Sequence, residues 1–183
     1  RSARETGRFF HGMEMTDNAL AEFLAHSVEL ESEARERYTE LADAMTGHHN
    51  REVASFFRRM AGEAQQHLAE VDELAQGMVL PQLKAWEFNW PEAEPPETAS
   101  YEAMHYRMSL REAMTLALAN ERAAESYYRG FAASSDDSET ARIAGLFADE
   151  ESYHAEELEL LLSRLPQGAA PTREEDDEPH MPE

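Results

Sequence analysis

Five residues could together bind metal ions: Glu31, His67, Glu121, Glu151 and His154. Each of these candidate ligands interrupts the apolar stripe of an amphipathic helical pattern, where burial of a carboxylate costs several kcal/mol unless it is paired or bound to a cation. A single buried glutamate or histidine is usually explained by a structural hydrogen bond. The five together offer only carboxylate oxygens and imidazole nitrogens, the donors that suit iron, manganese or zinc. Glu151 and His154, three residues apart, share one helix face.

The elements that must position these residues are four amphipathic helices, predicted by apolar residues that recur at alternating intervals of four and three. We expect the helices at about 17–45, 50–78, 109–131 and 138–165. Gly47 ends the first, and Ser109 or a neighbour caps the third. The fourth is capped within 134–138 and ends at Pro166. Every helix carries at least one candidate ligand near its centre.

Short connections at 47–50 and 134–138 predict that these helices pair as two antiparallel hairpins. Within each hairpin the candidate ligands lie equally far from the turn, so we expect them at one level. The segment 77–108 contains four prolines and is long enough to travel the length of a helix, which predicts a crossover between the hairpins. The predicted organisation is an all-α four-helix bundle at 16–165, an N-terminal extension at 1–15 and a disordered acidic tail at 166–183.

The two hairpins also resemble each other in sequence. Residues 60–71 align with 147–158, which places His67 on His154. In the other helix of each hairpin, Tyr38 and Tyr128 each follow the central glutamate by seven residues. Two related hairpins packed about a pseudo-twofold axis would bring all the candidate ligands to one point. We expect the two tyrosines to be core residues rather than redox-active ones, although they could hydrogen-bond a ligand carboxylate.

Composition excludes several classes of function. The chain has 38 acidic and 16 basic residues, a net charge of -22, so we expect it to bind neither nucleic acid nor anionic membranes. It has no cysteine, which excludes disulfides, thiolate metal sites and thiol nucleophiles. No segment approaches the roughly 20 apolar residues of a membrane span. We therefore expect a cytoplasmic protein.

Two motifs resemble the ferritin-like superfamily, and rubrerythrin-type proteins in particular. They are ESEARERYTELA at 31–42 and EESYH at 150–154, which contains a Glu-x-x-His sequence. The resemblance covers about 20–165 and implies a ferritin-like bundle with a carboxylate-bridged di-iron or related site. It also implies the ligand roles: Glu31 and Glu121 as terminal ligands, Glu151 as a bridge, and His67 and His154 as one nitrogen ligand for each metal.

One position departs from the family pattern. A second Glu-x-x-His would place a bridging glutamate three residues before His67, where this chain has Ala64. Glu63 lies on nearly the same helix face, and Gly62 could loosen the helix enough for Glu63 to take the missing place. Otherwise the second metal is weakly bound or absent. Because the chain lacks cysteine, it also lacks the rubredoxin domain of rubrerythrins, and peroxidase turnover would need an external electron donor.

The leading hypothesis is a non-haem iron protein, with two ions or one, that oxidises Fe(II) with O2 or reduces hydrogen peroxide in iron handling or oxidative-stress defence. It would be an oxidoreductase of the ferroxidase or peroxidase type, assembled as a homodimer or a larger homo-oligomer. One alternative is a non-catalytic metal carrier, which the alanine at position 64 favours. Another is a metal-free helical interaction module.

Overall fold

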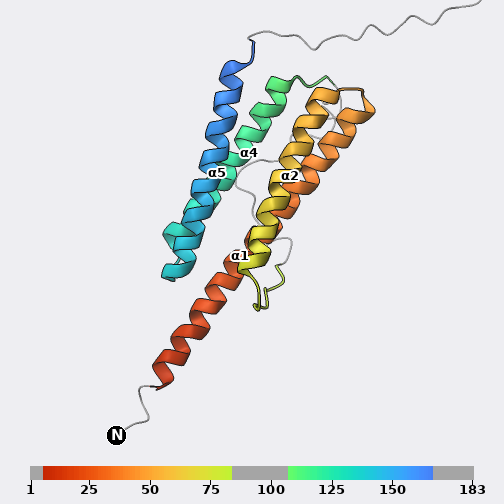
Figure 1. Cartoon of the computed structure of the whole chain (residues 1–183). Helices are drawn as coiled ribbons and strands as arrows, with labels where there is room; N and C mark the ends of the chain where they lie inside the picture. The colour runs from red at the N-terminus through yellow and green to blue at the C-terminus, as the bar shows by residue number, and fades with distance from the viewer. Residues whose placement is uncertain (1–5, 84–106, 167–183) are drawn as a thin grey trace, which may run out of the picture.

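The computed structural model describes residues 6–83 and 107–166, and it describes side chains from residue 18 onward. These residues form four long α-helices and no strand (Figure 1). In chain order the helices are α1 (Thr6–Gly47), α2 (Arg51–Leu74), α4 (Leu110–Ser134) and α5 (Ser138–Arg164). The predicted all-α class and its four helices are confirmed.

The helix starts follow from local hydrogen bonds that the sequence contains. The side chain of Asn50 accepts a hydrogen bond from the backbone of Val53 and caps α2. Ser109 and Glu112 form a reciprocal capping box at the start of α4. Asp137 caps α5 by accepting from the backbone of Thr140. The caps of α4 and α5 lie where the sequence predicts them, and α2 begins near residue 50 as expected.

Two helix ends differ from the prediction. Helix α1 begins at Thr6 rather than near residue 17, and its first turns project past the other helices (Figure 1). No proline interrupts residues 6–17, so the chain can stay helical beyond the part that shows an amphipathic pattern. Helix α2 ends at Leu74 rather than near residue 78. Gly77, at φ 82°, adopts a left-handed conformation that a helix cannot contain.

The helices pack as two hairpins, α1 with α2 and α4 with α5 (Figure 1). Asn50, which precedes α2, donates a hydrogen bond of 2.8 Å to the carbonyl of Met108, which precedes α4. Helices α2 and α4 therefore begin at the same end of the bundle, as a crossover between the hairpins requires. Most of that crossover, at 84–106, and nearly all of the tail, at 167–183, lie outside the described residues.

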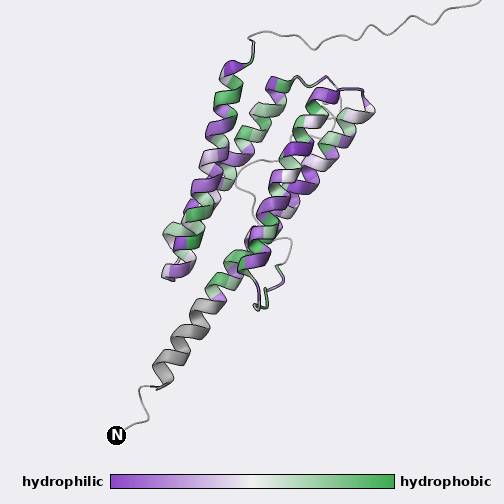
Figure 2. Ribbon diagram, in the orientation of Figure 1, coloured by the Kyte–Doolittle hydropathy of each residue, from purple (hydrophilic) through white to green (hydrophobic). Residues whose placement is uncertain are grey.

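The apolar core has two parts along the bundle axis. One surrounds Phe57 and Met45 near the 47–50 turn, and the other surrounds Phe23 and Tyr128 near the 134–138 turn. Apolar and polar residues alternate along the helices, as amphipathic packing requires (Figure 2). On each helix the candidate ligands lie between residues of the two core parts. Among the described helices, none combines the length and the apolar character that crossing a membrane requires.

Candidate metal centre

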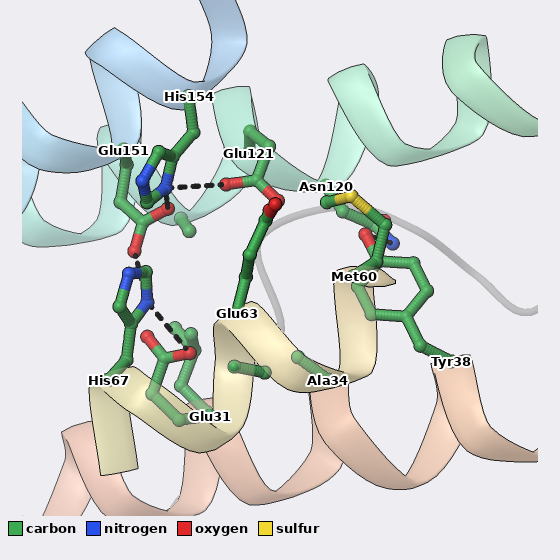
Figure 3. A pocket seen from close by; sticks show the side chains of 13 residues that line it. Glu31, Ala34, Tyr38, Met60, Glu63, His67, Asn120, Glu121, Glu151 and His154 are labelled. Atoms are coloured by element: carbon green, nitrogen blue, oxygen red, sulfur yellow. Dashed lines mark hydrogen bonds and ion pairs between the residues drawn. The ribbon is translucent and has the colours of Figure 1, made fainter. Parts of the chain in front are cut away.

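All five candidate ligands line one cavity between the hairpins (Figure 3). Its volume of about 30 Å³ is enough for a water molecule or an ion. Every helix of the bundle contributes: α1 supplies Glu31, α2 supplies His67, α4 supplies Glu121, and α5 supplies Glu151 and His154. Within each hairpin the candidate ligands are separated from the turn by similar numbers of residues, and their side chains lie at one level of the bundle, as predicted.

The first set of donors is Glu31, His67 and Glu151, here called the His67 group. The Nδ1 atom of His67 lies 3.4 Å from Oε2 of Glu31 and 3.4 Å from Oε1 of Glu151. Both carboxylates are buried, each 4% exposed. One donor atom from each residue falls within 4.8 Å of the others, so the three could hold one cation.

The second set is Glu121, Glu151 and His154, here called the His154 group. The Nδ1 atom of His154 lies 3.8 Å from Oε2 of Glu121 and 3.9 Å from Oε2 of Glu151. Glu151 therefore presents one oxygen to each histidine, and its carboxylate joins the two groups (Figure 3). The two imidazole rings lie nearly parallel, with their centroids 5.1 Å apart. This arrangement is suited to two neighbouring ions that share one carboxylate.

The two tyrosines of the repeated pattern have different partners. Tyr128 donates a hydrogen bond of 2.9 Å to Oε1 of Glu31, across the hairpins, and so leaves Oε2 facing His67. Tyr38 instead accepts a hydrogen bond of 3.1 Å from the side-chain amide of Asn120. Only the first contact orients a candidate ligand, so the pseudo-twofold pattern of the sequence is broken at the site.

Protons partly balance the buried negative charge. Burial alone would lower the pKa of His67, but the hydrogen bond and charge of Glu31, with the charges of Glu151 and Glu150, raise it to about 10. Burial and a hydrogen bond with Glu151 raise the pKa of Glu121 to about 10. Burial also raises the pKa of Glu151 to about 7. Near neutral pH the cluster thus holds protons on His67 and Glu121, which a cation would displace.

Ala64 and Glu63 occupy the part of the cavity wall where the family pattern would place a second bridging carboxylate. Ala64 is buried against the cavity, and α2 runs through Gly62 without interruption, so the helix distortion that would carry Glu63 inward is absent from this described helix. Glu63 still reaches the cavity wall, where its carboxylate extends towards that of Glu121 (Figure 3). Its side chain is 36% exposed and pairs with Arg59 at 3.7 Å. The donor groups found among the described residues do not include it.

Sequence reasoning missed Glu150. Its Oε1 lies 3.7 Å from Nε2 of His67, the nitrogen that faces away from the buried carboxylates. With His67 and His154 it forms a further set of donors within 4.8 Å of one another. Two signals in the sequence could have found it: Glu150 precedes His154 by four residues, and the internal alignment pairs it with Glu63.

The side chains fit a metal centre. The two groups offer carboxylate and imidazole donors, a set suited to iron, manganese or zinc. Donors about 2.1 Å from one ion and at right angles lie about 3.0 Å apart. The histidine-to-carboxylate separations of 3.4 to 3.9 Å are slightly wider, so a small inward movement would close either group on an ion.

Comparison with known proteins agrees with this geometry. Residues 22–162 match the rubrerythrin family. The chain is also similar to the crystal structure of an uncharacterized conserved protein from Magnetospirillum magnetotacticum MS-1, with 39% sequence identity and a TM-score of 0.65 over 80% of this chain and 95% of that one. The comparison with curated proteins gives no match. Because the family match covers most of the chain and includes parts of all four helices, the chain belongs to the rubrerythrin family of ferritin-like proteins.

Proposed function

We propose that this protein is a non-haem iron protein that oxidises Fe(II) with O2 or hydrogen peroxide. The observation that carries the proposal is the position of Glu151, whose two oxygens face His67 and His154 at 3.4 and 3.9 Å. A structural ion pair would need one such contact, whereas a shared carboxylate between two nitrogen donors is suited to two metal ions. Two ions are proposed, with iron as the metal and manganese or zinc as alternatives.

When bound, a pair of iron ions supplies the two electrons that the reduction of peroxide to water requires. Residues of this chain hold the ions and manage the accompanying protons. His67 and His154 would each present Nδ1, and Glu31 and Glu121 would each complete one group. Tyr128 keeps Glu31 oriented, and the burial of Glu31 and Glu151 excludes bulk water from the donor atoms. His67 and Glu121 would each give up a proton when the donors hold a metal ion.

The experiment that tests this function is anaerobic loading with Fe(II), removal of unbound metal and elemental analysis, followed by exposure to O2 or peroxide. We expect two irons per chain and oxidation of Fe(II) faster than in protein-free solution. Comparing the two oxidants separates a ferroxidase from a peroxidase, and a peroxidase would need an external electron donor to turn over.

The matched variants lie on one helix. Glu151→Ala with His154→Ala should abolish binding, whereas Glu156→Ala removes an exposed carboxylate of α5 outside both donor groups and should bind as the wild type does. A wild-type protein that binds no iron, or a double variant that binds as much as the wild type, would refute the proposal.

A second candidate function is a non-catalytic metal carrier. It is favoured by Ala64, because the carboxylate missing there would otherwise help to hold two ions together, and by the pairing of Glu63 with Arg59 rather than with either histidine. One iron per chain, bound without accelerated oxidation, would support the carrier over the oxidase.

A further inference from the structure

The outer side of His67 faces a second, smaller cavity. This cavity of about 10 Å³ is lined by Glu31, His67, Glu70, Phe147, Glu150 and Glu151. It shares Glu31, His67 and Glu151 with the main cavity, so the two meet at the His67 group. Its remaining carboxylates are more accessible: Glu70 is exposed, and the side chain of Glu150 is 39% exposed. Carboxylates thus run from the protein surface to the buried donors.

Glu150 is placed to hold a cation at this surface. Its Oε1 lies 3.7 Å from Nε2 of His67, and donor atoms of Glu150, His67 and His154 fall within 4.8 Å of one another. We call these three half-buried residues the outer group. It combines a carboxylate with two imidazoles, so its character as a cation site does not depend on acidic charge alone.

The pseudo-twofold repeat provides an internal comparison. Glu63, the counterpart of Glu150, lines the main cavity but pairs with Arg59 at 3.7 Å. A guanidinium beside Glu63 neutralises the carboxylate and repels a cation that approaches from that side. Glu150 instead lies beside Nε2 of His67, a nitrogen that can itself serve as a metal ligand, which a guanidinium cannot. A divalent cation at Glu150 therefore has nitrogen donors beside it, whereas a cation at Glu63 would meet a guanidinium.

Occupation of the outer group and of the His67 group requires different nitrogens of one ring. The outer group uses Nε2 of His67, whereas the buried carboxylates face Nδ1. A neutral imidazole has a single nitrogen lone pair available at a time, because the other nitrogen carries the proton. His67 thus cannot, as a neutral ligand, serve both positions together.

From this geometry we propose that the outer group is a capture site that binds Fe(II) transiently and passes it to the buried donors. The inference rests on the proposed function, in which Fe(II) is the substrate that must reach those donors. The ion first binds Glu150 with Nε2 of His67. It then moves past the ring to Glu31 and Glu151, which face Nδ1 on the inner side of the same imidazole.

The test is the rate of cation binding, measured anaerobically by stopped-flow absorption with Co(II) as the probe and by equilibrium dialysis for the final stoichiometry. For Glu150→Gln we expect the association rate constant to fall about tenfold, at the lower end of the effect of electrostatic focusing. The final number of bound ions should stay unchanged. The control Glu156→Gln removes the same charge from an exposed position of α5 and should load at the wild-type rate.

The outcomes separate this inference from the proposed function. Slower loading with unchanged stoichiometry in Glu150→Gln supports the capture site. Wild-type loading rates in that variant would overturn the capture site and leave the proposed function unaffected. Loss of a bound ion would also overturn the capture site, because Glu150 would then be a permanent ligand. A wild-type protein that binds no Co(II) or Fe(II) would overturn both proposals.

Discussion

Replacing Tyr128 with phenylalanine removes a phenolic hydroxyl that orients the candidate ligand Glu31. Tyr128 is fully buried, and its hydroxyl donates a hydrogen bond of 2.9 Å to Glu31. A hydrogen bond to a charged group contributes about 1.5–3 kcal/mol. Loss of a residue that orients a metal ligand typically costs about 10–100-fold in affinity, which corresponds to about 1.4–2.8 kcal/mol. We therefore expect Tyr128→Phe to weaken binding of one ion by about 10–100-fold.

The matched control is Tyr38→Phe, at the equivalent position of the repeat. Tyr38 is also buried, but its hydroxyl pairs with Asn120 rather than with a carboxylate. Both variants should lose thermal stability, whereas only Tyr128→Phe should lose metal affinity. Calorimetric titration with Mn(II) under anaerobic conditions measures the affinity, and thermal unfolding of the metal-free proteins measures the shared structural effect. Equal affinity losses in the two variants, or none in Tyr128→Phe, would refute the reasoning.

Three further predictions concern the charges of the site. Ala64→Glu adds a buried carboxylate, so the metal-free variant should unfold at a lower temperature than the wild type, while Mn(II) should stabilise the variant more than it stabilises the wild type. Folding raises the pKa of His67 and of Glu121 to about 10 and that of Glu151 to about 7, so the native metal-free protein binds more protons than the unfolded chain. Its stability should therefore fall as the pH rises between about 5 and 10. The contribution of His67 to the free energy of unfolding is complete below the pKa that His67 has in the unfolded chain, and it is lost as the pH rises to about 10. Thermal unfolding across this range checks the sign, and rising stability would contradict it. Finally, Mn(II) binding at pH 7.5 should release about two protons, detectable with an indicator dye in weak buffer. Binding without proton release would show that His67 and Glu121 are already deprotonated.

Local sequence was sufficient for most of the fold. The caps at Asn50, Ser109 and Asp137 depend on hydrogen bonds within a few residues, and the apolar spacing depends only on the helical repeat. Helix ends were predicted less well. Helix α1 continues through residues 6–17, beyond its amphipathic part. The chain after α2 cannot stay helical at Gly77, where φ becomes positive.

The sequence also determined which residues could form the site. Five residues stand out because burying a polar side chain on an apolar helix face is costly: Glu31, His67, Glu121, Glu151 and His154. Their equal distance from the two short turns is enough to bring them to one level of the bundle. Their role as metal ligands remains a prediction. The pseudo-twofold repeat likewise follows from the sequence, because it is an alignment of residue positions in the two hairpins and does not depend on which side chains touch.

Only the tertiary structure decided how these residues pair. Tyr128 reaches Glu31 across the hairpins while its counterpart Tyr38 pairs with Asn120, and Glu150 faces His67 while its counterpart Glu63 pairs with Arg59. Related sequences thus make unlike contacts. The physical reason is that periodicity specifies which side chains face the core, whereas the choice among hydrogen-bond partners a few ångströms apart depends on how the two hairpins dock and which rotamers the packing allows.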